Sequence, residues 1–167
     1  MNVSLSPNVV SALRFPLAAA FPLVPGVAAK LVIVAAAAAT DFLDGRLARG
    51  RDRVTRRGEL LDPIADKAFM LAALLTLAIG RGIPAWTIPL FLTRDIGVAS
   101  GALLSLARGR RSWPARLPGK AVTWLQFLGI GVCLVWPATA PFAAAILAAA
   151  GLAALADYAR APRAPAR

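Results

Sequence analysis

The sequence predicts an all-α integral membrane protein with six transmembrane helices and a polar cavity that faces the cytoplasm. Of its 167 residues, 59% are hydrophobic, and the mean hydropathy is +0.68, which is more apolar than a water-soluble domain of this size. The apolar runs do not alternate with polar residues as the strands of a membrane barrel do, so we expect helices. The length indicates a single domain over residues 1–167.

Six apolar segments are long enough to be considered as membrane spans. Their expected bounds are 9–23, 27–44, 60–79, 84–107, 121–136 and 142–158. The first span is short, contains Pro16 and Pro22, and ends at the turn formed by residues 24–26. The second contains the alanine run 35–39, which permits close helix packing.

The later spans are separated by breaker residues or by basic loops. The third ends at the Gly-Arg-Gly sequence of residues 80–82, and the fourth carries the charged pair Arg94 and Asp95 near its middle. A basic loop precedes the fifth span, and the charge-free turn 137–141 precedes the sixth.

The basic residues predict the orientation of these spans. Segments 45–58, 108–120 and 159–167 hold six, five and three of the 19 Lys and Arg residues. Cytoplasmic loops of membrane proteins are enriched in Lys and Arg. We therefore expect the protein to lie in a bacterial-type inner or cell membrane. Both termini and segment 45–58 would then be on the cytoplasmic side.

The net charge of +11 has two possible explanations. It could indicate nucleic-acid binding, but basic loops beside membrane helices meet anionic lipid headgroups. We therefore expect membrane lipids and no nucleic acid as partners. The chain contains no histidine, so any metal site or general base has to be built from carboxylates.

Carboxylates concentrate between the second and third spans, where residues 41–66 hold six of the eight acidic residues. Asp41 and Asp44 are three residues apart, and Asp62 and Asp66 are four apart, so each pair shares one face of a helix. If the two spans pack antiparallel, the pairs converge. Four close carboxylates stay ionised together only when cations neutralise them, and hard oxygen ligands suit Mg²⁺ or Mn²⁺.

These carboxylates have other possible explanations. The Asp side chains could simply mark helix ends at the water interface. They could also line the ion path of a cation transporter, although no comparable acidic residues lie on the other side of the membrane. The chain could also be an inactive scaffold, but the complete set of four Asp residues argues against that.

The spacing in this region resembles the signature of the CDP-alcohol phosphatidyltransferase family. The pattern D-x2-D-G-x2-A-R-x8-G-x3-D-x3-D is matched at all eight positions and at every spacing. The matching residues are Asp41, Asp44, Gly45, Ala48, Arg49, Gly58, Asp62 and Asp66. The six-span layout also agrees with the fold of that family.

The resemblance implies roles for these residues. Asp41, Asp44, Asp62 and Asp66 would bind two divalent ions, Mg²⁺ or Mn²⁺, which bridge the diphosphate of CDP-diacylglycerol. Asp66 would also be the catalytic base that accepts the proton of the alcohol acceptor. The nucleotide-binding residues would be Gly45, Ala48, Arg49 and Gly58. The resemblance also implies a homodimer.

The acceptor alcohol is expected to bind elsewhere, because the signature does not encode it. Arg94 lies inside a span, where an arginine is costly unless it faces a polar cavity, and Lys120 and Thr123 begin the fifth span on the same side. Arg94 could instead be a structural partner of Asp95, and Lys120 an ordinary loop lysine. Asn8 and Arg14 resemble the Asn/Thr/Arg spacing at the start of family members, and Arg14 could equally be a buried structural arginine.

Glycerol 3-phosphate is the expected acceptor, which would give phosphatidylglycerophosphate and CMP. The positions of Arg94 and Lys120 resemble those of basic residues in phosphatidylglycerophosphate synthases of the family. Those synthases, however, tend to have Arg-Glu where this chain has Arg94-Asp95. An Arg-Asp pair is more similar to the one in the cardiolipin synthases of this fold. Phosphatidylglycerol is therefore the alternative acceptor, and inositol phosphate is the third.

Overall fold

The protein folds into a bundle of helices in a computed structural model, which describes residues 12–47, 56–107 and 117–160. The helices are α2 (Arg14–Leu23), α3 (Val27–Leu47), α4 (Arg56–Arg81), α5 (Thr87–Phe91), α6 (Thr93–Ala107), α7 (Leu117–Val135) and α8 (Ala140–Arg160), with a short 3-10 helix at Pro137–Thr139. The all-helical class predicted from the sequence is confirmed for the described residues. Each predicted span corresponds to a helix, or in one case to two helices.

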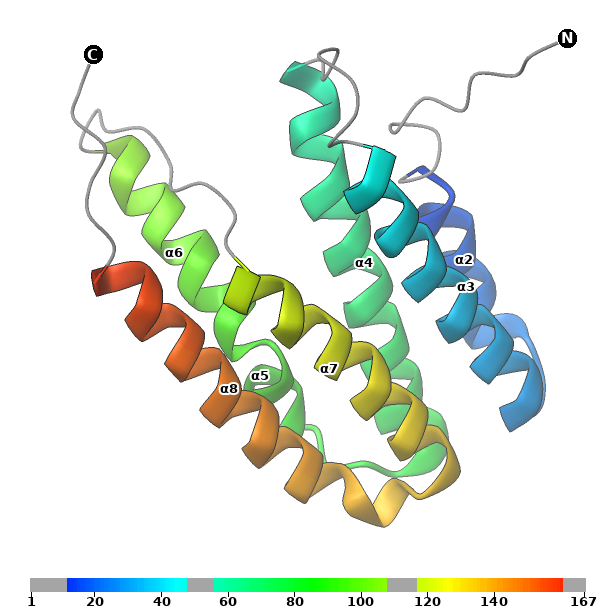
Figure 1. The fold of residues 1–167 in the computed structure, drawn as a ribbon. Coiled ribbons are helices and arrows are strands. Elements are labelled where there is room, and N and C mark those ends of the chain that lie inside the picture. Colours follow the sequence, from blue (N-terminus) through cyan, green and yellow to red (C-terminus); the bar gives the residue numbers. More distant parts are fainter. Residues whose placement is uncertain (1–11, 48–55, 108–116, 161–167) are drawn as a thin grey trace, which may run out of the picture.

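Helix α7 occupies the middle of the bundle (Figure 1). It packs against α3, α4 and α8, while α2 packs against α3 and α4, and α8 packs against α5 and α6. The arrangement places α2, α3 and α4 on one side of α7, with α2 packed against both α3 and α4, and α5, α6 and α8 on the other side (Figure 1). Residues from five of these helices can therefore meet around the same end of α7.

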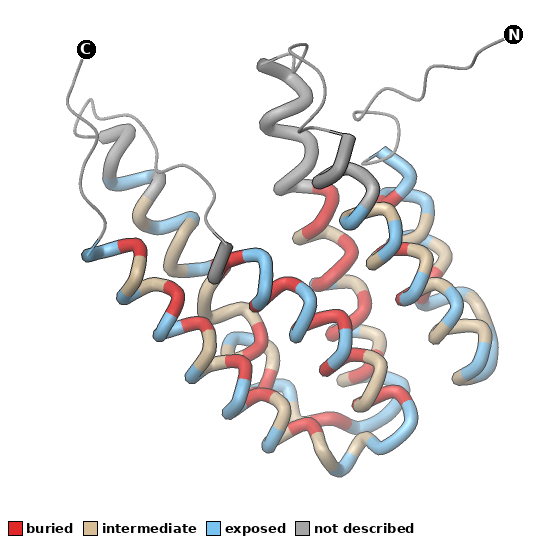
Figure 2. Tube along the Cα trace, in the orientation of Figure 1, coloured by how far each residue is buried: buried red, intermediate tan, exposed pale blue. Residues whose placement is uncertain are grey.

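A row of aromatic rings forms the centre of the core. The ring of Phe69 on α4 lies 5.8 Å from that of Phe21 on α2 and 6.0 Å from that of Phe127 on α7, measured between centroids. All three side chains are buried, and Figure 2 shows buried positions along the facing sides of α4, α7 and α8. The interior is thus apolar through the middle of the bundle.

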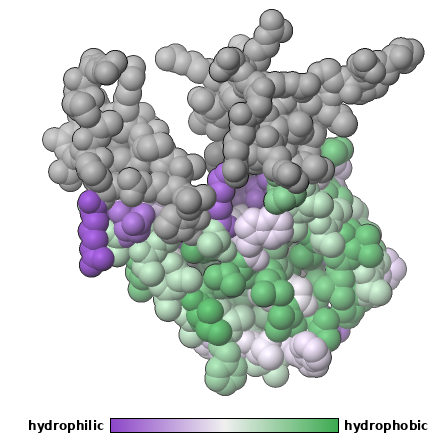
Figure 3. Space-filling view, in the orientation of Figure 1, coloured by the Kyte–Doolittle hydropathy of each residue, from purple (hydrophilic) through white to green (hydrophobic). Residues whose placement is uncertain are grey.

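Large apolar side chains also cover the outside of the bundle. Exposed examples occur on α2, α3, α4, α6, α7 and α8, and Ile79 and Phe142 are 87% and 73% exposed. Figure 3 shows hydrophobic residues over most of the described surface on that face, with hydrophilic residues toward its upper edge. An apolar exterior of this extent is unusual for a protein in water.

One helix of the described residues, Pro137–Arg160, is long and apolar enough to cross a membrane, and Gly119–Val135 is a shorter apolar helix. The structure therefore supports an all-helical fold with a membrane-type surface, while the six-span arrangement stays a prediction.

The fourth predicted span is not one continuous helix, because the chain bends at Leu92 between α5 and α6. At the bend, the side-chain amide of Gln126 on α7 donates a hydrogen bond of 2.8 Å to the carbonyl oxygen of Phe91. A side chain that enters the helical hydrogen-bond ladder is a recognised cause of kinks.

Lys30 closes the end of α2 opposite Arg14. Its ammonium donates hydrogen bonds of 2.8 Å to the carbonyl oxygens of Phe21 and Val24 and lies 5.2 Å from the centroid of the Phe21 ring. Cations near a helix C-terminus stabilise its unpaired carbonyls. This lysine therefore has a structural role.

The aromatic row predicts the effect of a core truncation. Replacing Phe69 by Ala should destabilise the protein by about 3–5 kcal/mol, because the cavity would lie between the Phe21 and Phe127 rings. Thermal unfolding in detergent micelles measures the loss. The matched control is Leu71→Ala on the same helix, since Leu71 is 43% exposed and should cost much less. Equal losses in the two variants would contradict the assignment of the core.

Candidate functional site

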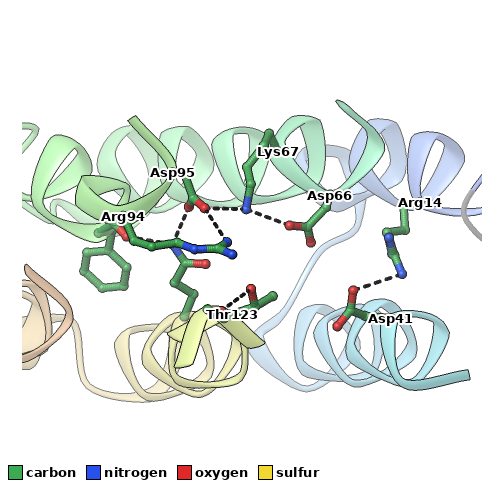
Figure 4. A network of polar contacts seen from close by, with 10 residues as sticks. Arg14, Asp41, Asp66, Lys67, Arg94, Asp95 and Thr123 are labelled. Atoms are coloured by element: carbon green, nitrogen blue, oxygen red, sulfur yellow. Dashed lines mark hydrogen bonds and ion pairs between the residues drawn. The ribbon is translucent and has the colours of Figure 1, made fainter. Parts of the chain in front are cut away.

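Charged side chains from α2, α3, α4 and α6 and polar side chains from α7 form a network at one end of the bundle (Figure 4). Arg14, Asp41, Asp66, Lys67, Arg94 and Asp95 are the charged members. The contacts form two sets, Arg14 with Asp41 and Lys67 with Asp66 and Asp95, and the two sets lie near enough for the charges of Asp66 and Lys67 to act on Asp41. The convergence of the second and third predicted spans is thus seen for Asp41 and Asp66.

Arg14 holds Asp41 from the neighbouring helix. Its side chain is only 2% exposed, and its Nη2 lies 3.3 Å from Asp41 Oδ1. Its Nε donates a hydrogen bond of 3.2 Å to the hydroxyl of Thr40, which in turn donates one of 2.7 Å to the Ala37 carbonyl. Arg14 therefore contacts a predicted metal ligand. Through this contact, α2 holds the Asp41 side chain of α3 in place.

Lys67 joins two carboxylates. Its ammonium lies 2.7 Å from Asp66 Oδ2 and 2.8 Å from Asp95 Oδ1. The Asp66 and Asp95 side chains are 10% and 7% exposed, whereas that of Lys67 is 34% exposed. Lys67 therefore lies at the open side of the network and links α4 to α6.

Asp95 is the meeting point of three helices. Besides Lys67, its Oδ1 accepts a hydrogen bond of 3.0 Å from Arg94 Nη1, and its Oδ2 accepts one of 2.6 Å from the Gln126 amide on α7. A buried carboxylate is tolerated when it is paired in this way. Arg94 and Asp95 thus pair with each other, as the structural alternative for Arg94 predicted. Asp95 also binds Lys67 and Gln126, so the pair belongs to a larger network.

Gly119 on α7 has no side chain, and this leaves space for the guanidinium of Arg94. A Cβ built on Gly119 would lie 2.6 Å from the Tyr158 hydroxyl and closer still to Arg94 Nη2. Tyr158 on α8 also hydrogen-bonds to the Arg94 side chain. On α7, Lys120 is exposed and the buried Thr123 hydroxyl donates a hydrogen bond of 3.3 Å to the Gly119 carbonyl.

At several predicted site residues the structure describes the backbone alone or lacks a description of the residue altogether. Asp44 and Gly45 belong to α3, and Gly58 and Asp62 belong to α4, but their side-chain surroundings are not described. Asn8, Ala48 and Arg49 fall in the undescribed segments 1–11 and 48–55. The metal, nucleotide and Asn8 assignments at these positions stay predictions.

The residues present fit a divalent ion in their chemistry. Within the described residues, Asp66 Oδ1 is buried and has no hydrogen-bond partner, which is costly for a carboxylate oxygen unless another group binds it. Carboxylate oxygens are the ligands that Mg²⁺ and Mn²⁺ prefer. The described side chains include no cluster of three or more metal-ligating residues, and the side chains of Asp44 and Asp62 are not among those described.

The sequence did not identify Lys67, Gln126 or Thr40 as part of the site. Lys67 directly follows Asp66, and a charged residue so close to a predicted base in an apolar helix was a usable signal. Gln126 is an amide inside an apolar span and was a weaker one. The partners of both depend on the crossing of α4, α6 and α7, which no spacing within one helix reveals.

Comparisons with known proteins identify the family of the chain. The model of the CDP-alcohol phosphatidyltransferase family matches residues 4–156. A probable phosphatidylglycerophosphate synthase of Mycobacterium tuberculosis is 38% identical over 122 residues, which are 72% of this chain and 57% of that protein. A CDP-diacylglycerol–glycerol-3-phosphate 3-phosphatidyltransferase of Bacillus subtilis is 36% identical over 99 residues, 59% of this chain and 51% of that protein.

A putative cardiolipin synthase of Mycobacterium tuberculosis is also similar, at 31% identity over 137 residues, which are 77% of this chain and 64% of that protein. The chain therefore spans between half and two thirds of the length of these three relatives. The names of these relatives thus refer to phosphatidylglycerophosphate, to glycerol 3-phosphate and to cardiolipin.

The contact between α2 and α3 yields a test of the site's construction. Arg14→Met should destabilise the protein by about 2 kcal/mol, because Asp41 would lose its ion pair and Thr40 a hydrogen bond. Arg14→Lys should lose less, since a cation remains near Asp41. Thermal unfolding of the purified variants measures both losses. If Arg14→Met is as stable as the unmodified protein, Arg14 does not hold the two helices together.

Proposed function

The chain belongs to the CDP-alcohol phosphatidyltransferase family, and we propose that it transfers a phosphatidyl group from CDP-diacylglycerol to glycerol 3-phosphate and releases CMP. The products would be CMP and phosphatidylglycerophosphate, in phospholipid biosynthesis. The observation that supports the reaction most is the buried oxygen of Asp66 that has no hydrogen-bond partner among the described residues, in a network that also contains Asp41 and three cations. A single carboxylate at a helix end would not need such surroundings.

The ions would be held by Asp41, Asp44, Asp62 and Asp66, as the family signature implies. When bound, two Mg²⁺ or Mn²⁺ ions supply positive charge that neutralises the diphosphate and stabilises the CMP leaving group. Gly45, Ala48, Arg49 and Gly58 would form the nucleotide site. Glycines permit close approach of the backbone, and the planar guanidinium of Arg49 suits a phosphate.

Asp66 would act as the general base. One oxygen, Oδ2, accepts a hydrogen bond from Lys67, which leaves Oδ1 to accept the proton of the attacking hydroxyl. The alcohol oxygen forms a bond to the phosphorus that carries the diacylglycerol, and the bond from that phosphorus to the CMP oxygen breaks. The proton remains on Asp66 until it is lost to water, and CMP leaves with the bonding electron pair.

Arg94 is the strongest candidate for binding the acceptor. Its side chain is 14% exposed, it is braced by Asp95, and its buried Nε has no partner among the described residues. Lys120 and Thr123 lie on α7, beside Gly119, against which Arg94 packs. Two relatives with names that refer to glycerol phosphate products or acceptors favour glycerol 3-phosphate.

Phosphatidylglycerol is the second candidate acceptor. The putative cardiolipin synthase among the relatives and the Arg94-Asp95 pair favour it. Arg14 is a weaker candidate for acceptor binding, because it is buried against Asp41 and Thr40.

The protein would work within a membrane. Six spans, both termini and the site on the cytoplasmic side, and a homodimer form the arrangement that we propose. The apolar exterior of six helices supports membrane insertion, and the distribution of Lys and Arg residues supports the orientation.

An acceptor screen tests the function directly. Purified protein with CDP-diacylglycerol and Mg²⁺ should release CMP with glycerol 3-phosphate, and much more slowly with phosphatidylglycerol or inositol phosphate. Chelation by EDTA should stop release, and added Mg²⁺ or Mn²⁺ should restore it. An absence of CMP with all three acceptors would refute the proposed reaction, and release with phosphatidylglycerol alone would select the second candidate.

The different roles of two carboxylates give a second test. Asp66→Asn should lower turnover by about a hundredfold or more, because the base is removed, yet retain more CDP binding than Asp41→Asn does. Turnover is followed by CMP release and binding by calorimetry with CDP and Mg²⁺. Equal loss of nucleotide binding in the two variants would show that Asp66 acts only as a ligand.

A further inference from the structure

The network contains a cation to which neither the predicted site nor the proposed reaction gives a role. Lys67 contacts both Asp66 and Asp95, and its side chain remains 34% exposed. The side chain is therefore accessible from outside the network. Lys67 links Asp66, the proposed general base, to the region around Arg94.

Asp95 sets the distance between Lys67 and Arg94. The two cations bind the same oxygen, at 2.8 Å and 3.0 Å, so their nitrogens are no more than about 6 Å apart. One phosphate group can bridge such a pair, because charge-assisted hydrogen bonds of about 2.7–2.9 Å can run from two of its oxygens to the two nitrogens. Asp66, the other carboxylate in contact with Lys67, is a predicted ligand of the divalent ions, so Asp95 is the one carboxylate among these contacts that faces both cations.

Gln126 fixes Asp95 itself. Its Nε2 donates hydrogen bonds to the Phe91 carbonyl and to Asp95 Oδ2, and the side chain is buried. Both partners are acceptors, so the orientation of the amide is determined. Asp95 is therefore held from α7 at the kink between α5 and α6 and cannot turn away from the two cations.

We propose that Lys67 and Arg94 together bind the phosphate of the acceptor, and that Asp95 and Gln126 are positioning residues for this cation pair. The inference rests on the proposed function and names the class of acceptor: a small alcohol with a phosphomonoester. A phosphomonoester carries up to two negative charges at neutral pH, which suits two cations better than the single charge of a phosphodiester. Because Lys67 also contacts Asp66, the bound acceptor has its hydroxyl close to the base.

Lys67→Met tests the binding role. The methionine keeps much of the side-chain volume and removes the charge. We expect the KM for glycerol 3-phosphate to rise about ten- to hundredfold, the range of one charge-assisted hydrogen bond, with a smaller change in kcat. Lys67→Arg should recover part of the loss. The matched control is Arg81→Met, which removes a positive charge about 20 Å further along α4 and should leave KM unchanged.

Asp95→Asn and Gln126→Met test the positioning role. Each should raise the KM for glycerol 3-phosphate and leave the affinity for CDP unchanged, because the cation pair loses its anchor while the nucleotide site is intact. A fall in kcat with an unchanged KM in Lys67→Met would overturn the proposal, since Lys67 would then act only through Asp66. An unchanged KM in both Asp95→Asn and Gln126→Met would overturn the positioning role.

Direct binding separates this inference from the proposed reaction. Calorimetric titration of the unmodified protein with glycerol 3-phosphate, in the presence of CDP and Mg²⁺, does not require turnover. If the protein binds glycerol 3-phosphate and Lys67→Met does not, the inference stands even if no CMP is released. If both bind it equally, the inference fails whether or not the protein is active.

Discussion

The structure depends on ion pairs that join neighbouring helices. Arg14 of α2 is paired with Asp41 of α3, and Lys67 of α4 with Asp95 of α6. An unpaired charge among apolar helices would cost several kcal/mol. The pairs therefore determine which helix ends meet, and they place the candidate site where those ends converge.

The same pairing connects the kink of the fourth predicted span to the site. Gln126 binds both the Phe91 carbonyl at the kink and the Asp95 carboxylate one turn later. The same side chain therefore contacts the bend between α5 and α6 and orients Asp95. Asp95 in turn binds Lys67 and Arg94. A straight helix over 84–107 would lack this link between the backbone and the charged network.

The sequence was sufficient to predict the helices and the acidic signature, because both follow from spacing along one chain. Apolar run lengths located α3, α4, α7 and α8 within a few residues, and the Asp spacing placed Asp41 and Asp66 in a common site. Lys67 and Gln126 were not predicted, since their partners lie on other helices. The kink at Leu92 was missed for the same reason, because the side chain that binds the backbone at the bend comes from α7.

The central claim is that the carboxylates of α3 and α4 hold a pair of divalent ions. Electron paramagnetic resonance of the purified protein titrated with Mn²⁺ in the presence of CDP tests it most directly. The account predicts two bound ions per chain, with weakened or lost binding in Asp66→Asn and in Asp41→Asn. It would be contradicted by a protein that binds no Mn²⁺ under these conditions, or by both variants binding two ions as tightly as the unmodified protein.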